Sequence, residues 1–238
     1  IIFCRIGTCL AFAPGFSSPR IPVRVRLLTA ISLSLVVAPG LLDAGKLNLA
    51  AASGPQAIAL IVQESLIGAA MGVMARLFFA LFEMMLTAAS MAIGASSSFS
   101  VRVDESESIP EFAALVMFSA TSLLFITNMH WEIVRAVHDS YAALPLGSGA
   151  DMRFTVEKLA DTLSTGSSVA FRLAAPFIFF GLVANFGFAL ANRLIPQVAI
   201  YFVAAPVVLF CGLFLLSKLW GDIATHFLDA FGDWLNRI

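Results

Sequence analysis

The side chains best suited to proton transfer or metal binding in this sequence are its three histidines, His130, His138 and His226. They stand apart from one another: the sequence has no HExxH helix motif and no His/Cys cluster with the spacing of a zinc site. It also has no Gly-rich phosphate loop, so the chain is not itself an ATPase. These patterns predict a protein with no metal ion, no cofactor and no catalytic machinery.

The three cysteines could in principle bind a metal ion or form a redox site. Cys4, Cys9 and Cys211 form no CxxC pair, and each lies in an apolar run. We interpret them as small buried hydrophobic residues, with a metal or redox site as the alternative.

A Ser-rich turn, Gly94-Ala95-Ser96-Ser97, is the arrangement closest to nucleophilic chemistry. It resembles the Ser motif of intramembrane serine proteases, in which a His on a partner helix activates the hydroxyl. His130 borders a predicted helix end, and the other two histidines lie in polar stretches. We interpret the segment as a flexible turn and keep an intramembrane enzyme as an alternative.

Three charged residues within a long apolar block are the better functional signal: Glu64, Arg76 and Glu83. Charge inside a membrane is costly unless it is paired or faces water. Arg76 and Glu83 share a helix face but lie about 10 Å apart along it, which is too far for direct pairing. We expect each charge to meet another helix, another subunit or an aqueous lumen.

Two further basic residues, Arg172 and Arg193, bracket a later apolar run. Long basic side chains at the ends of a membrane helix can extend to the interface. We interpret both residues in this way, with a functional role as the alternative.

The elements that position these residues are predicted to be membrane helices. Of the 238 residues, 60% are hydrophobic and 12% are charged, against about 25% charged in a typical soluble domain. The mean hydropathy is +0.93. The net charge is −1 and the basic residues form no dense patch, which argues against a nucleic-acid partner.

Six apolar runs cover residues 6–19, 27–42, 57–101, 112–129, 173–191 and 197–217. About 20 helical residues cross a hydrocarbon core, a length that the last two runs meet well. As one helix, residues 57–101 would extend about 60 Å, so we expect this block to bend, double back or leave the bilayer. We predict a single all-α, multi-helix integral membrane domain over residues 1–238, with kinked helical hairpins.

Smaller features refine this organisation. Gly68 and Gly72 form a small-xxx-small pair, which either allows close helix packing or arises by chance in an Ala/Gly-rich helix. Residues 20–26 carry three arginines, which favours a cytoplasmic position. The chain opens on Ile1 inside an apolar stretch that is not a signal peptide, and we expect that preceding residues are missing.

An amphipathic tail over residues 217–238 completes the pattern. Its apolar residues recur at three and four positions, and we expect this stripe to dock on a partner subunit or lie at the membrane interface. The stripe consists of Leu219, Ile223, Phe227, Phe231 and Trp234.

Several short motifs follow one another along the chain in a characteristic order and spacing. The most specific is Asn192-Arg193-x-x-Pro196-Gln197, followed by Ile200, Tyr201 and Pro206. The others are Ile21-Pro22-Val23-Arg24-Val25-Arg26, the stretch from Gln63 to Gly72 with Glu83, and Asn128-x-His130-Trp131 with Ser140, Pro145 and Gly147. Together these motifs resemble the FliR family of flagellar export-gate proteins and their virulence type III secretion relatives.

The resemblance covers essentially the whole chain and implies a structural role without catalysis. It implies a bacterial inner-membrane protein of the flagellar basal body, in a helical assembly around a pore for unfolded export substrates. The partners that it implies are FliP-like and FliQ-like subunits and an FlhB-like protein. It also implies that assembled helices lie partly above the bilayer plane, which would explain the overlong charged block.

In this family the loop after the third block plugs the closed pore, which here corresponds to residues 94–109. The expected plug residues are Gly94, Ala95, Ser96, Ser97, Ser98, Phe99, Ser100 and Val101. The small residues would let chains converge and move, the apolar pair Phe99 and Val101 would resist wetting, and Pro110 would begin the next helix. An ordinary exposed connection is the alternative for this loop. A virulence homologue, a membrane transporter and an intramembrane enzyme are the alternatives for the whole chain.

Overall fold

Seven α-helices and one β-hairpin make up the part of the chain that the computed structural model describes, residues 1–18, 21–43, 54–95, 100–104, 107–146, 152–194 and 200–237. The elements are α1 (Ile2–Phe12), α2 (Val23–Asp43), α3 (Gly54–Ala92), β1 (Ser100–Asp104), β2 (Glu107–Pro110), α4 (Glu111–Ile126), α5 (Met129–Ala143), α6 (Met152–Leu194) and α7 (Ile200–Leu235). The expected multi-helix membrane architecture is confirmed, and the structure adds the short hairpin to it.

Four of these helices are long and apolar enough to cross a membrane. The candidate spans are Val23–Gly40, Gly54–Ala92, Phe154–Leu194 and Ala204–Leu235, and α4 with α5 would make a fifth if the pair forms one span. The protein is therefore a multi-span helical membrane protein, because helices of this kind satisfy their backbone polar groups internally.

The long helices extend further than the apolar runs suggested. The third apolar block forms one helix as far as Ala92, without doubling back before that residue. The chain then turns at residues 93–95. In the same way α6 joins the polar segment after residue 151 to the run at 173–191, and α7 continues from its apolar half into the amphipathic tail. Pro176 and Pro206 lie inside α6 and α7 without ending them.

The chain divides into two compact units. Unit 1 contains residues 1–79, 127–165 and 231–238, and unit 2 contains residues 80–126 and 166–230. Each of α3, α6 and α7 contributes residues to both units.

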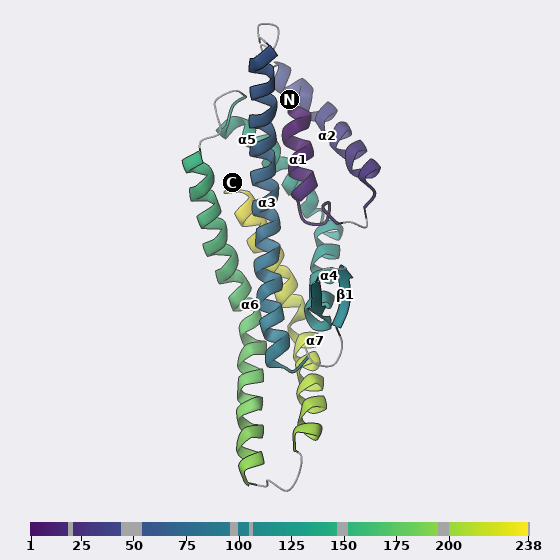
Figure 1. Cartoon of the computed structure of the whole chain (residues 1–238), viewed down its shortest axis with the longest axis vertical. Coiled ribbons are helices and arrows are strands. Elements are labelled where there is room, and N and C mark those ends of the chain that lie inside the picture. Colours follow the sequence, from purple (N-terminus) through teal and green to yellow (C-terminus); the bar gives the residue numbers. More distant parts are fainter. Residues whose placement is uncertain are drawn as a thin grey trace. The chain divides into compact units, whose positions relative to one another are not determined.

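In unit 1, α1 lies against α3 (Figure 1). A Cβ on Gly68 would stand 2.1 Å from the carbonyl oxygen of Arg5, and one on Gly72 would stand 2.5 Å from that of Cys9. Only glycine permits backbones to approach this closely. The small-xxx-small pair is therefore a packing site between α1 and α3 and not a chance occurrence.

Four residues of the amphipathic stripe at the end of α7 are buried within the chain itself, Ile223, Phe227, Phe231 and Trp234, and Leu219 is half-buried. In unit 1, Phe231 packs edge-on against Phe79 at 5.2 Å between ring centroids, and Trp234 lies 5.4 Å from Phe78. The indole Nε1 of Trp234 donates a hydrogen bond to Thr162 Oγ1 at 3.1 Å. The expectation that this stripe docks on another subunit or on the membrane interface is therefore wrong, because its aromatic rings fill the core beside α3.

In unit 2, aromatic rings again hold the helices together. Phe82 of α3 stacks on Phe227 of α7 at 4.3 Å, and Phe112 of α4 meets the edge of Phe177 of α6 at 5.2 Å. Helices α6 and α7 run side by side in this unit (Figure 1), with an apolar groove of about 340 Å³ between them.

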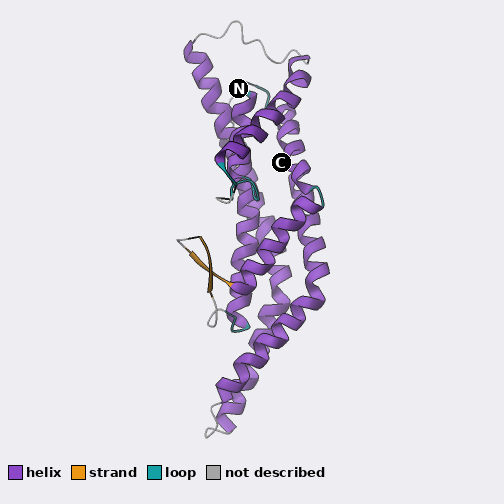
Figure 2. Ribbon diagram, turned by 90° about the vertical axis from the view of Figure 1, so that its right-hand side faces the viewer, coloured by secondary structure: helices purple, strands orange, loops and turns teal. Residues whose placement is uncertain are grey.

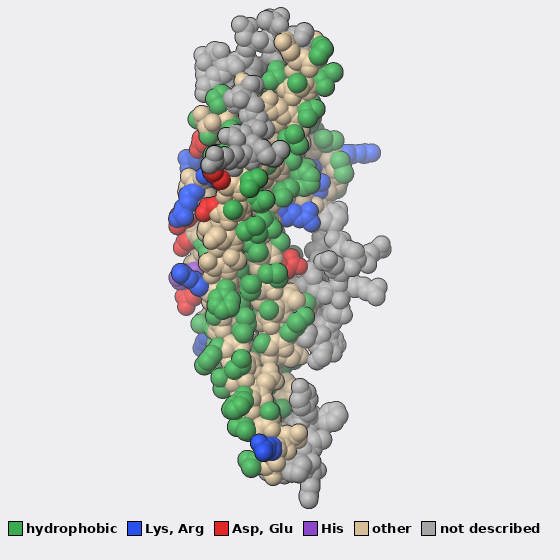
Figure 3. Space-filling view, turned by 60° about the vertical axis from the view of Figure 1, so that its left-hand side comes forward, with side chains coloured by type: hydrophobic (Ala, Val, Ile, Leu, Met, Phe, Trp, Pro, Cys, Tyr) green, Lys and Arg blue, Asp and Glu red, His purple; other side chains and the backbone are tan. Residues whose placement is uncertain are grey.

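Much of the remaining surface is apolar. Hydrophobic side chains cover a large part of the visible face in Figure 3, and Phe179, Phe186 and Phe210 are each more than 60% exposed. Half of the α3 span is buried within the chain, whereas 11% of the α2 span and 17% of the α6 span are buried. Helices α2 and α6 therefore present apolar faces to lipid or to other proteins.

Candidate functional site

The segment expected to act as a plug begins at a well-defined helix end. Gly94 adopts a left-handed conformation with φ of 72°, and its N–H donates to the Met91 carbonyl at 3.1 Å. The N–H of Ala95 reaches back to the Ser90 carbonyl at 2.8 Å. These two bonds form a Schellman motif, which ends α3 and fixes the direction in which the chain leaves it.

Part of the expected plug forms a β-hairpin. Ser100 and Val101 belong to β1, which pairs antiparallel with β2 in the register Ser100 to Pro110 and Val101 to Ile109 (Figure 2). Both strands contact α4. Pro110 ends β2, so α4 begins one residue later than expected, at Glu111. The remaining expected plug residues, Ser96, Ser97, Ser98 and Phe99, lie outside the described residues.

A buried ion pair joins α1 to α3 in unit 1. The Nε atom of Arg5 donates to Glu64 Oε2 at 2.6 Å, and its Nη2 atom donates to Oε1 at 3.0 Å. Both side chains have no exposed surface. The two parallel bonds match the guanidinium fork to the carboxylate, which is the strongest arrangement for such a pair.

Helix α5 completes the surroundings of the guanidinium. Arg5 also donates to Ser140 Oγ and to the Leu144 carbonyl, each at 3.1 Å, and its Cζ atom lies 4.0 Å from the centre of the Tyr141 ring. A guanidinium has about five N–H donors, and four of those of Arg5 make hydrogen bonds. The charge that would be costly in an apolar core is balanced by a carboxylate and by neutral acceptors.

Glu64 was expected to meet another helix, another subunit or an aqueous lumen, and its partner lies on α1 of the same chain. Arg5 itself was missed. The available signal was a single arginine between apolar residues, Ile2 and Ile6, where an ionised side chain requires a buried partner.

The other two charges of the long block are placed differently. Arg76 is exposed on the surface of the isolated chain, and Glu83 is half-buried. Arg76 belongs to unit 1 and Glu83 to unit 2. Neither shares the environment of Glu64.

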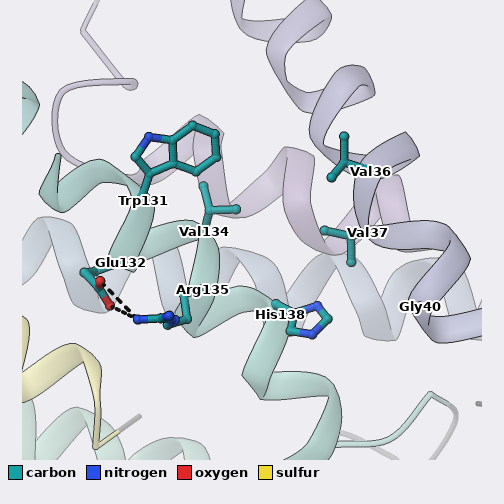
Figure 4. A pocket seen from close by; sticks show the side chains of 8 residues that line it. All are labelled: Val36, Val37, Gly40, Trp131, Glu132, Val134, Arg135 and His138. Carbon is teal, nitrogen blue, oxygen red and sulfur yellow. Dashed lines mark hydrogen bonds and ion pairs between the residues drawn. The ribbon is translucent and has the colours of Figure 1, made fainter.

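A surface groove lies between α2 and α5 in unit 1 (Figure 4). Its volume is about 470 Å³, and it is lined by Val36, Val37, Gly40, Trp131, Glu132, Val134, Arg135 and His138. Glu132 and Arg135 pair with each other at 3.3 Å on the exposed side of α5. The groove therefore combines an apolar wall from α2 with a mixed polar wall from α5.

The residues of the most specific sequence motif lie around the α6–α7 connection. Asn192 and Arg193 are exposed in the last turn of α6, where a basic side chain interacts favourably with the helix dipole. Pro196 and Gln197 lie outside the described residues, and Pro206 is exposed inside α7. Arg172 is exposed on α6, in a position compatible with the interpretation that it extends to an interface.

The three histidines lie on two helices, His130 and His138 on α5 and His226 on α7. His226 Nδ1 donates to the Asp222 carbonyl of its own helix at 2.7 Å. Among the residues that the structure describes, no group of three or more His, Cys, Asp and Glu side chains is placed to hold a metal ion. The serines that a nucleophilic mechanism would need lie beyond the described part of the chain.

Apolar spans, buried aromatic cores and an internally paired charge define a helical membrane protein whose exposed faces are suited to lipid or to neighbouring subunits. The chain belongs to the bacterial export proteins, family 1, because the model of that family matches residues 1–234.

Curated relatives with similar sequences align with this chain over nearly its full length. The chain is 28% identical to the flagellar biosynthetic protein FliR of Caulobacter vibrioides, over 99% of this chain and 93% of that protein. It is 26% identical to the protein of the same name from Escherichia coli K12 and 25% identical to that of Aquifex aeolicus, covering 98% and 96% of this chain and 88% and 89% of those proteins.

Proposed function

We propose that this chain is a structural subunit of the flagellar type III protein export gate, in the bacterial inner membrane at the flagellar basal body. The family match over residues 1–234 carries the proposal, and it is supported by relatives that are named flagellar biosynthetic proteins. Their names favour flagellar export over a virulence system. The subunit helps to form the channel for unfolded export substrates and performs no catalysis.

The exposed apolar faces of α2 and α6 support assembly with other membrane proteins. The partners are FliP-like and FliQ-like subunits and an FlhB-like protein. Affinity purification of this chain from its own membranes should recover the FliP-like and FliQ-like subunits together with it. Recovery of the chain alone, stable and monodisperse, would contradict a role as a gate subunit.

The segment at residues 94–109 closes the channel before export. It leaves α3 through a fixed glycine turn and continues into a hairpin beside α4, so it is attached at both ends to ordered structure. Its small residues allow several copies or neighbours to converge on a narrow axis, and an apolar constriction there resists hydration.

Deleting residues 96–100 tests the closing role. The assembled gate should then conduct small ions, measured as loss of membrane potential in cells or as flux from proteoliposomes. An equal deletion of residues 48–52, in the connection before α3, is the matched control and should leave the membrane tight. A tight membrane with normal assembly after the first deletion would show that this segment closes nothing.

A further inference from the structure

One backbone carbonyl at the end of α3 is satisfied from another helix. The Schellman turn uses the carbonyls of Ser90 and Met91, and Ile93 donates to the carbonyl of Ala89 at 3.1 Å. The Ala92 carbonyl instead accepts a hydrogen bond from Asn185 Nδ2 of α6 at 2.9 Å. The last turn of α3 is therefore completed by a side chain 93 positions away in the sequence.

Two glycines bring α6 and α7 against the same turn. A Cβ on Gly181 of α6 would lie 2.4 Å from the Ala92 carbonyl oxygen, a distance that no real Cβ contact shows. A Cβ on Gly212 of α7 would lie 3.0 Å from Ile93 Cδ1, and Ile93 is fully buried. A side chain at Gly181 would push the turn away from α6, and one at Gly212 would require the Ile93 side chain to shift by a few tenths of an ångström.

The hydrogen bond of Asn185 comes from a largely apolar surface of α6. This residue stands on an exposed face, between Leu182 and Phe186. Side-chain hydrogen bonds between membrane helices contribute modestly to stability. The bond therefore acts together with the close glycine packing to hold the end of α3.

We propose that α6 and α7 anchor the root of the closing segment, with Asn185 and Gly181 as positioning residues. Gly94 follows the anchored Ala92 by two residues, so the place where the segment leaves α3 is set by the α6–α7 hairpin. Export would then require the segment to move about a fixed root while α3 stays in place. This inference rests on the proposed closing role of residues 94–109.

The test uses the complete chain in the gate assembled with its partners. Asn185→Asp removes the donor at nearly constant size, and Asn185→Gln keeps an amide. Gly181→Val introduces the clash, and Gly187→Val is the matched control on the same helix, because a Cβ on Gly187 has nothing within 4 Å. The two readouts are hydrogen–deuterium exchange of residues 90–95 and ion leakage across the membrane.

We expect exchange in residues 90–95 to be about tenfold faster in Asn185→Asp and in Gly181→Val. Both variants should also leak ions, Asn185→Gln should recover part of each property, and Gly187→Val should match the wild type. Unchanged exchange in both variants would show that the helices do not anchor this turn. If both variants exchange faster without leaking ions, while the deletion of residues 96–100 does leak, then the contacts of α6 and α7 with this turn do not contribute to closing the channel.

The failure of the proposed function has a different signature. If deletion of residues 96–100 leaves the membrane tight, the closing role is wrong and the positioning role falls with it, whatever the exchange of residues 90–95 shows.

Discussion

Arg5 Nε and Glu64 Oε2 are 2.6 Å apart, and neither side chain has any exposed surface. The pair joins α1, which has 11 residues, to α3, which has 39, across 59 positions of sequence. Its bonds lie beside Gly68, where the two backbones come into contact. Charge pairing and glycine packing therefore fix α1 on α3 at the same place.

Replacing one member of this pair should be more harmful than replacing both. Glu64→Leu leaves a buried, uncompensated guanidinium and should cost about 3–5 kcal/mol of stability. The double variant Arg5→Met with Glu64→Leu should recover most of this loss. Thermal unfolding of the purified gate in detergent measures both effects.

The exposed pair of Glu132 and Arg135 provides the control. Arg135 is 67% exposed, so Glu132→Gln should change stability by no more than about 0.5 kcal/mol. If Glu64→Leu and Glu132→Gln lower the stability equally, burial does not determine how much each ion pair contributes.

Enlarging Gly68 should separate α1 from α3. Gly68→Val places its side chain on the Arg5 carbonyl and should cost about 1–3 kcal/mol. Gly221→Ala, at a helical glycine whose Cβ would meet nothing within 4 Å, should instead stabilise α7 by up to about 1 kcal/mol. Opposite shifts in the midpoint of thermal unfolding would support this distinction, and two similar shifts would refute it.

Phe227 is expected to act as a core residue of unit 2. Its ring stacks on Phe82 and is 1% exposed, so Phe227→Ala should cost about 3–5 kcal/mol. Phe210→Ala on the same helix removes a ring that is 72% exposed and should leave the fold intact. Limited proteolysis of each variant measures how well the fold resists cleavage. If Phe227→Ala resists the protease as well as the wild type does, Phe227 is not a core residue.

Arg76 and Glu83 are proposed to face other subunits or the lumen in the assembled gate. Arg76 is exposed within the long apolar α3, and a lipid-facing charge there would be costly. Arg76→Leu and Glu83→Leu should each reduce the recovery of complete gates or the export of substrate, whereas Arg172→Leu should have little effect. Native gel analysis and a secretion assay provide the measurement, and normal results for both variants would contradict the proposal.

The sequence predicted the helices better than their contacts. Apolar runs and helical spacing placed α2, α4 and the apolar parts of α6 and α7, because hydrophobic periodicity is a local property. The stripe from Leu219 to Trp234 was read correctly as one helical face. The partner of that face could not be predicted, since the side chains that cover it, such as Phe78 and Phe82, come from a distant segment.

The candidate site shows the same limit. Gly94 was recognised as a turn residue, but the hydrogen bond from Asn185 to Ala92 and the pairing of Arg5 with Glu64 join residues far apart in the sequence. The hairpin could have been anticipated, because Ser100, Val101, Arg102 and Val103 alternate between polar and apolar, as in a strand. The Ser-rich composition just before them favoured a turn instead.

The distances along the sequence between Arg5 and its partners also limit how the topology of this chain can be mapped. Its acceptors lie 59, 135 and 139 positions later, so a nascent chain carries an unpaired guanidinium until Glu64 has been synthesised and lacks its last two acceptors until Leu144. Reporter fusions truncated before Glu64 would carry α1 without its counter-charge and would misplace it. Reporters should therefore be inserted into full-length chains, so that each fusion retains every acceptor of Arg5.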